Sequence, residues 1–163
     1  MFAFSTVVHT RVLLREITAD LPHCLLAVFT SDTYLNNKSI LNVLHSEDEF
    51  TELLCLAGVL NSKALSIFYK ATAVKSARRI FPKVVAKNLA ELPYPVAMKA
   101  ELRMSIAQRV TRVMELNARL AVVNTDHDRT VAVRELAAEE RQLDRAVYSL
   151  FGLADDDIAL IET

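Results

Sequence analysis

The feature that most constrains the fold is a long apolar repeat that follows Pro95. Apolar residues recur in it at steps of three and four, the spacing that aligns side chains along one face of an α-helix. The repeat runs over residues 102–123, stops at the polar stretch 124–128 and resumes over residues 133–150. Two amphipathic helices joined by such a short tip are expected to pack side by side. The sequence therefore predicts an antiparallel helical hairpin within residues 97–163.

The first part of the chain carries a different pattern, in which short apolar runs alternate with turn residues. Val7–Ile17 and Cys24–Thr30 are rich in β-branched and aromatic residues, which favour strands. Asn36–Lys38 is typical of a turn because asparagine tolerates left-handed backbone, and a third strand is predicted at Ser39–Leu44. We expect these strands to form a small mixed or antiparallel sheet.

Helices are predicted after the strands. The polar run Ser46–Glu49 is expected to start a helix, with its serine as the cap and acidic residues in the first turn. The apolar period that follows is broken near Gly58–Ser62, so we predict two helices, the second capped by Asn61 and Ser62. Residues 83–96 are predicted to form an extended segment and a short helix that ends at two prolines.

These patterns divide the chain into two parts. Residues 1–96 are expected to form an α+β domain, a small sheet with packed helices, and residues 97–163 the helical hairpin. A chain of 163 residues is long enough to bury a core of ordinary size. No apolar run approaches the ~18 residues that cross a bilayer, so we expect a soluble, cytoplasmic protein with no membrane partner.

Sequence motifs for catalysis are missing. Gly58 and Gly152 are the only glycines, which excludes a glycine-rich phosphate loop and a nucleophile elbow. Cys24 and Cys55 are too far apart for a metal knuckle or a redox pair, and the four histidines share no ligand spacing. The sequence therefore predicts no catalytic residue, no metal site and no cofactor bound by this chain.

Charge is distributed unevenly, although the net charge is only -1. Residues 1–99 carry 11 Lys and Arg against 8 Asp and Glu, while residues 100–163 carry 8 against 12. No acidic residue occurs between Glu52 and Glu91, where seven basic residues fall: Lys63, Lys70, Lys75, Arg78, Arg79, Lys83 and Lys87. An acidic partner is expected at this basic part, and a solvated surface is the alternative.

Five segments occur in an order that resembles a known family. They are RVLLREI (11–17), TYLNNKSILNVL (33–44), LAGVLNSKALSIFYK (56–70), FPKVVAKNLAELPYPV (81–96) and LDRAVYSLFGL (143–153). Together they are similar to the TaqI-like C-terminal specificity domain, the target-recognition part of type IIG restriction-modification enzymes and of related adenine-N6 DNA methyltransferases. The LNSK segment and the FPKV to LAELPYP segment also resemble the target-recognition domains of type I specificity subunits. Because a complete enzyme of the family carries a methyltransferase domain ahead of this point, we expect either an excised domain or a stand-alone specificity protein.

The resemblance implies that the chain reads double-stranded DNA. Such a domain needs Lys and Arg for phosphates and a few polar side chains for base edges. The basic residues expected to contact DNA, three on a loop and two on an extended edge that would anchor phosphates, are Lys75, Arg78, Arg79, Lys83 and Lys87. The residues of a second candidate loop are Asn36, Asn37, Lys38 and Ser39. For this second loop, a turn held by its asparagine side chains is an equally good interpretation.

The resemblance also implies partners. The chain would position a methyltransferase domain or subunit on a specific site, and S-adenosylmethionine would bind that partner. The acidic hairpin would act as a spacer or as a homodimer contact. The alternative hypothesis is a protein interaction module, in which the hairpin and the basic loop hold another protein. Charge reversal at Arg78 and Arg79 separates the two, since only the first predicts duplex binding that can be abolished.

Overall fold

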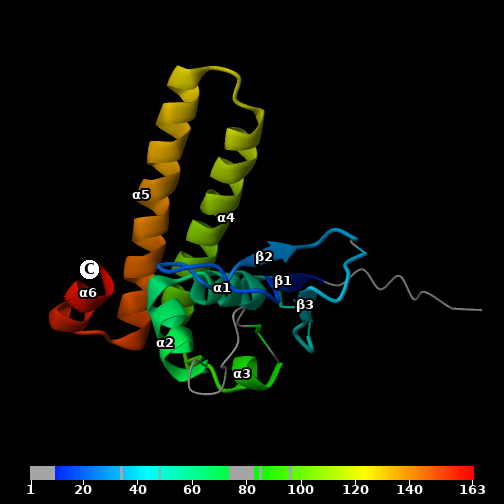
Figure 1. Ribbon diagram of the computed structural model, residues 1–163, viewed down its shortest axis with the longest axis vertical. Coiled ribbons are helices and arrows are strands. Elements are labelled where there is room, and N and C mark those ends of the chain that lie inside the picture. Colours follow the sequence, from blue (N-terminus) through cyan, green and yellow to red (C-terminus); the bar gives the residue numbers. More distant parts are fainter. Residues whose placement is uncertain (1–9, 34, 48, 74–82, 85, 96) are drawn as a thin grey trace, which may run out of the picture.

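The chain folds into a small sheet with packed helices from which a long helical hairpin rises. The computed structural model describes residues 10–33, 35–47, 49–73, 83–84, 86–95 and 97–163. Among these residues the strands are β1 (Arg11–Arg15), β2 (Ala27–Thr30) and β3 (Ile40–Val43). The helices are α1 (Phe50–Leu60), α2 (Lys63–Ala73), α3 (Ala86–Ala90), α4 (Ala100–Val122), α5 (Asp126–Phe151) and α6 (Asp155–Ile161). Figure 1 shows an L shape, and the predicted α+β class with a C-terminal hairpin is confirmed (Figure 1).

The sheet is antiparallel throughout, with β1 between β2 and β3. Leu13 lies opposite Val28 of β2 and opposite Asn42 of β3. Because side chains alternate along a strand, Val12 and Leu14 point to the opposite face, where both are fully buried. All three predicted strands are confirmed with shorter bounds; residues 1–9, where the first was expected to begin, lie outside the described residues.

The predicted pair of helices is confirmed as α1 and α2, but the cap expected at Ser46 is wrong. Glu49 is the N-cap residue of α1, and its side chain makes no capping bond. The residues before it form a turn of their own, in which the Glu47 backbone N–H donates to His45 Nδ1 at 3.2 Å. At the start of α2 the expected cap is present, since Ser62 Oγ accepts from the Leu65 backbone N–H at 3.2 Å.

The core joins the sheet, α1 and the base of the hairpin. Val12, Leu53, Ile106 and Val147 belong to one buried cluster although they come from four elements. Helix α1 approaches α4 closely at Gly58, where an added Cβ would lie 2.8 Å from Val110 Cγ2 and 2.9 Å from Ile106 Cγ2. A side chain at this position would hold the two helices apart. The division into residues 1–96 and 97–163 stays a prediction, and apolar packing is continuous across it.

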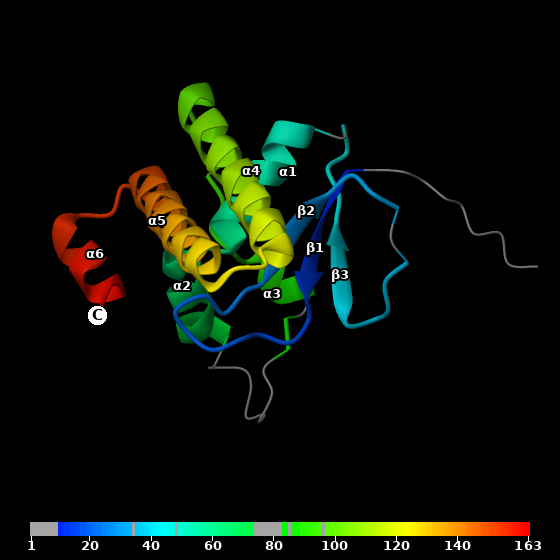
Figure 2. The same ribbon diagram turned by 90° about the horizontal axis from the view of Figure 1, so that it is seen from above.

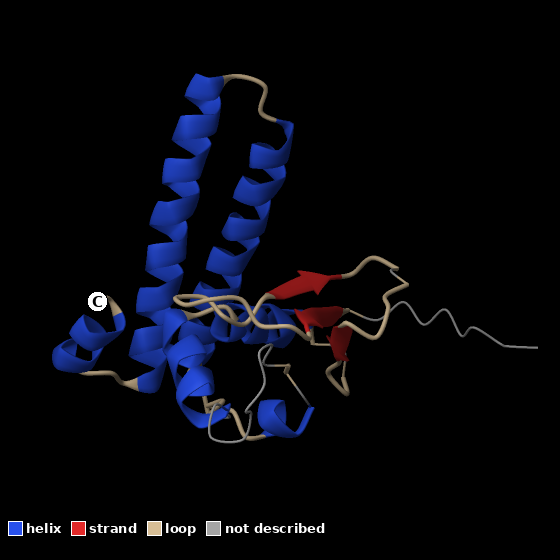
Figure 3. Cartoon of the chain, viewed as in Figure 1, coloured by secondary structure: helices blue, strands red, loops and turns tan. Residues whose placement is uncertain are grey.

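The hairpin extends well beyond this core (Figures 1 and 3). Thr125 caps α5 by accepting from the Asp128 backbone N–H at 3.1 Å. Ion pairs join the two helices, between Arg109 and Glu139 at 2.9 Å and between Arg119 and Glu135 at 2.8 Å. Gly152 ends α5 with φ 63°, a left-handed conformation that glycine adopts without strain. The short helix α6 then turns back beside α5 and α2 (Figure 2).

Within the described residues, no single helix has the length and apolarity needed to span a membrane. The two helical segments Phe50–Leu60 and Lys63–Thr72 have the required length and apolarity only when they are counted together, and they are bent by 64° to each other.

Candidate nucleic-acid interface

The two segments that the sequence analysis proposes for DNA contact meet at the end of β1. The Glu16 backbone N–H donates to Ser39 O at 2.8 Å, and Glu16 O accepts from the Val84 backbone N–H at 2.6 Å. Residues 17 and 83 also form an antiparallel β-bridge. We call this arrangement the Glu16 joint. It brings the Asn36–Ser39 turn and the segment that begins at Lys83 to the same edge of the molecule.

The Asn36–Ser39 turn is held by its own asparagine side chains. Asn37 Oδ1 accepts from the Ser39 backbone N–H at 2.9 Å, and Asn36 Nδ2 donates to Ile40 O at 3.2 Å. The turn interpretation is therefore correct for these two amides, which hold the backbone in shape. Lys38, at the tip, is exposed, and no described carboxylate pairs with it. The turn presents a cation on a fixed backbone.

The basic residues near the joint differ in how firmly they are held. Lys83 is exposed and forms an ion pair with Glu16 at 3.2 Å. Lys87, on α3, is exposed and has no carboxylate partner among the described residues. Lys70, in the last turn of α2, lies 3.5 Å from Thr18 Oγ1. The charge of Lys83 is thus offset by Glu16, whereas Lys87 is available to an outside anion.

The other three predicted contacts fall outside the described residues. Lys75, Arg78 and Arg79 belong to the stretch 74–82. Their neighbours on both sides are described: α2 ends at Ala73, and Val84 is fixed at the Glu16 joint. The described residues that flank this stretch therefore belong to α2 and to the Glu16 joint.

The LNSK segment is part of the scaffold, but the capping of α2 expected from Asn61 is wrong, because its side chain bonds Ala27 instead. Asn61 Nδ2 donates to Ala27 O at 2.7 Å, and Asn61 Oδ1 accepts from the Ala27 backbone N–H at 2.9 Å. One amide thus completes the hydrogen bonding of a residue on an edge strand, as a neighbouring strand would. Sequence analysis missed this role because the two residues are 34 positions apart.

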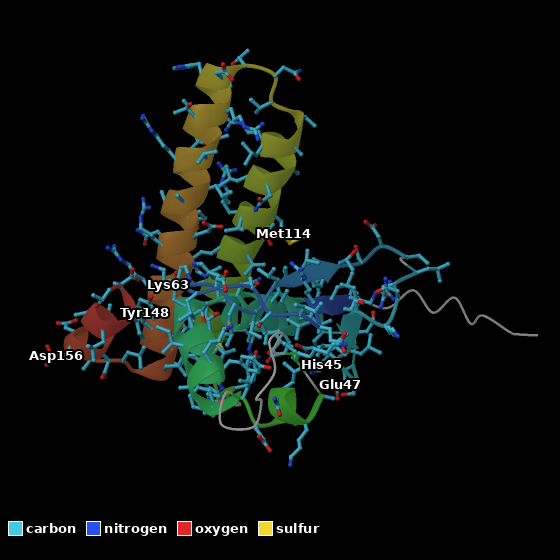
Figure 4. All side chains as sticks on the ribbon, in the orientation of Figure 1. His45, Glu47, Lys63, Met114, Tyr148 and Asp156 are labelled. Atoms are coloured by element: carbon cyan, nitrogen blue, oxygen red, sulfur yellow. The ribbon has the colours of Figure 1, made fainter. Side chains whose placement is uncertain are left out.

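Lys63 and a buried carboxylate continue the scaffold into the hairpin. Asp144 of α5 is only 2% exposed, and its Oδ1 accepts from the Lys63 backbone N–H at 2.9 Å, which caps α2 from another helix. Burial raises the pKa of Asp144 above its usual value, although the Lys63 amide acts in the opposite direction. The Lys63 ammonium bonds Glu162, which also accepts from Tyr148 Oη at 2.7 Å (Figure 4). These contacts lock α2, α5 and α6 together.

The two thiols do not resemble nucleophiles. Both are buried, and burial raises the pKa of Cys24 and raises that of Cys55 to about 11. A reactive cysteine needs the opposite shift, because the thiolate is the nucleophile. Among the described residues no three His, Cys, Asp or Glu side chains are placed to hold a metal ion.

The first part of the chain matches a known protein family. Residues 3–94 match the family model of the TaqI-like C-terminal specificity domain. The chain belongs to this family. The match covers the sheet, α1, α2, α3 and the Glu16 joint, and it stops before the hairpin.

The hairpin of this specificity domain has a counterpart in a solved structure. The type IIL restriction-modification enzyme MmeI, determined in complex with DNA, superposes with a TM-score of 0.63 at 15% sequence identity. The superposition covers 98% of this chain and 21% of the MmeI chain. At this identity the likeness concerns the fold, and it includes the hairpin as well as the sheet. No curated protein sequence matches the chain.

Proposed function

We propose that this specificity domain recognises double-stranded DNA for a restriction-modification system and is non-catalytic by itself. Membership of the family supports this function. The observation that carries it is the Glu16 joint, which fixes the Asn36–Ser39 turn and the segment from Lys83 at one edge. Lys38 and Lys87 lie on these segments without a carboxylate partner among the described residues. A cluster of exposed cations at one edge suits a phosphate backbone.

The finer parts of the proposal concern the partner. The domain would position an adenine-N6 methyltransferase domain or subunit on its target site, and S-adenosylmethionine would bind that partner. Calorimetry with S-adenosylmethionine is expected to give no heat of binding to this chain. A saturable heat would overturn the assignment of the cofactor to the partner.

The hairpin would serve as a spacer or as a contact between two copies. Its exposed apolar side chains are Met104, Val122 and Val133, and the last two lie toward its tip. Sedimentation over a concentration series tests the homodimer directly. A mass that rises with concentration, and that Val122→Glu/Val133→Glu returns to the monomer, supports the contact; a constant monomer mass contradicts it.

DNA recognition is tested by fluorescence anisotropy with a long mixed-sequence duplex over a salt series. The variant Arg78→Glu/Arg79→Glu is expected to lose binding. The matched control is Arg112→Glu/Arg129→Glu, which makes the same change in net charge at two exposed positions of the hairpin. Retained binding in the control with loss in the first variant supports a local contact surface. Equal loss in both would indicate an effect of net charge alone, and no binding by the native chain at low salt would contradict the proposal.

A further inference from the structure

A groove lies where the hairpin meets the start of β2, away from the Glu16 joint. Its volume is about 450 Å³, within the range of binding pockets. Leu26 and Val28 form one wall and are 38% and 47% exposed, while Val110, Val113 and Met114 of α4 form the other. Figure 4 shows Met114 on the side of α4 toward β2. Large apolar side chains open to solvent in a hollow are typical of an interaction site.

The polar end of the groove contains a carboxylate oxygen without a hydrogen-bond partner. His23 lies beside it, and its Nδ1 donates to Asn61 O at 2.7 Å, which leaves Nε2 facing Asp144. Asp144 Oδ2 lies 3.9 Å from this Nε2, too far for a hydrogen bond. Asp144 Oδ2 is buried and has no hydrogen-bond partner among the described residues.

An unpartnered carboxylate oxygen in a buried position is unusual, because removing it from water without a hydrogen bond is costly. The other oxygen of the Asp144 carboxylate has a partner, since Oδ1 accepts from the Lys63 backbone N–H and so caps α2. Glu140 adds a second carboxylate to the lining, and the lining includes no Lys or Arg. The charged side chains of the lining are therefore both carboxylates, and the charge of the groove favours a cation.

We propose that this groove receives an arginine or lysine side chain from a protein partner. The aliphatic stem would lie along Val28 and Met114, and the charged head would donate to Asp144 Oδ2. Arg and Lys combine an apolar stem with a cationic head, which is the combination that this groove complements. Duplex DNA does not fit, because its phosphates would meet Asp144 and Glu140.

A second copy of the chain is a weaker occupant than a different protein. Two arginines of the hairpin that a second copy would present, Arg109 and Arg119, already pair with Glu139 and Glu135. Under the proposed function, the partner that carries the cationic side chain is the methyltransferase domain. Only this last attribution rests on the proposed function, since the chemistry of the groove follows from its own residues.

The groove chemistry is tested on the full chain by nuclear magnetic resonance with two probes. The first probe is Nα-acetyl-arginine N-methylamide, and the second is its citrulline analogue, which has the same shape without the charge. Saturable shifts of the Ala27, Val28, Met114 and Leu143 amide signals are expected with the arginine probe. The citrulline probe is expected to bind about tenfold more weakly, because a hydrogen bond to an ionised group is the stronger kind.

Asp144→Asn sharpens the test because it changes one atom at the groove. Asn Oδ1 can still cap α2, while an amide nitrogen replaces Oδ2 and removes both the charge and the acceptor. The variant is expected to fold and to lose the preference for arginine over citrulline. Glu135→Gln, on the same helix but away from the groove, is the matched control and should keep that preference.

The possible results distinguish a protein partner, a second copy of the chain and DNA as the occupant of the groove. Equal shifts with both probes, or shifts that never saturate, would overturn the proposal. A dimer that forms through these residues, seen as a concentration-dependent mass that Val113→Glu abolishes, would replace the partner by a second copy. Duplex binding in Asp144→Asn should equal that of the native chain; loss of it would assign the groove to DNA. Failure of the native chain to bind DNA would contradict the proposed function. The comparison of the arginine and citrulline probes would still test the groove.

Discussion

The two ends of this molecule use charge in opposite ways. In the hairpin, arginines of α4 pair with glutamates of α5 at 2.8–2.9 Å, so the charges are used within the fold. At the Glu16 joint, the segments are held by backbone hydrogen bonds, and Lys38 and Lys87 have no carboxylate partner among the described residues. Net charge along the sequence therefore matters less than which charges the fold leaves available to a partner.

The largest expected effect tests whether the two regions share one fold. Gly58→Val places a branched side chain where Val110 and Ile106 approach within 3 Å of an added Cβ. We expect the free energy of unfolding to fall by about 2–3 kcal/mol, as for other overpacked cores. Urea unfolding followed by circular dichroism measures it, with the exposed change Ala71→Val as the control.

A single weakened transition in Gly58→Val would mean that sheet and hairpin unfold together. Two separate transitions would contradict a shared core. The boundary near residue 97 would then separate two domains that unfold independently. An unchanged stability would contradict the close approach of α1 and α4.

The next effect concerns the link between the LNSK segment and the sheet. Asn61→Ala removes both partners of the Ala27 backbone, and we expect a loss of about 1–3 kcal/mol because a half-buried donor and acceptor are left without these hydrogen bonds. The control is Asn117→Ala, whose exposed amide bonds only Val113 O of its own helix. A similar small loss in both variants would show that water replaces Asn61 without cost.

A smaller effect is expected on DNA affinity. Lys38→Ala/Lys87→Ala should lower the slope of log affinity against log salt by about 0.9 for each phosphate that no longer has a lysine beside it. Lys63→Ala is the comparison, because its ammonium is already bound by Glu162. Anisotropy titrations at several salt concentrations give the slopes. If Lys63→Ala lowers the slope as much, a lysine that is paired within the fold contributes to DNA binding as much as an unpaired one. The proposed difference between the two regions would then be wrong.

The smallest effect is expected in the hairpin. Arg119→Ala removes an ion pair whose side chains are 48% and 41% exposed, so we expect a loss of at most about 1 kcal/mol. Duplex binding should stay unchanged. Chemical denaturation and anisotropy on the same preparation check both, and a clear loss of DNA binding would place part of the contact surface on the hairpin.

Local patterns predicted the elements, and long-range contacts accounted for what was missed. The hairpin, three strands and the Ser62 cap follow from spacing and propensity within a few residues. The Ser46 cap failed because His45 stabilises a separate turn before the helix. The pairing of Asn61 with Ala27 and the capping of α2 by Asp144 depend on residues 34 and 81 positions apart, and no local pattern encodes them.

The candidate site was predictable in composition but not in arrangement. The basic gap in the sequence pointed to Lys83 and Lys87, and turn chemistry pointed to Asn36–Ser39. Only the fold shows that Glu16 joins these segments, through backbone atoms that every non-proline residue possesses.

This last property bears on how a new specificity can arise. Because the joint uses only the N–H and C=O groups of Glu16, Ser39 and Val84, substitutions in either attached segment leave the hydrogen bonds of the joint unchanged. Reading residues can therefore diverge between relatives without any compensating change in the framework. A library that randomises position 38 and positions 86–87, and keeps the turn-holding Asn36 and Asn37, would search for new target sites with little loss of folded variants.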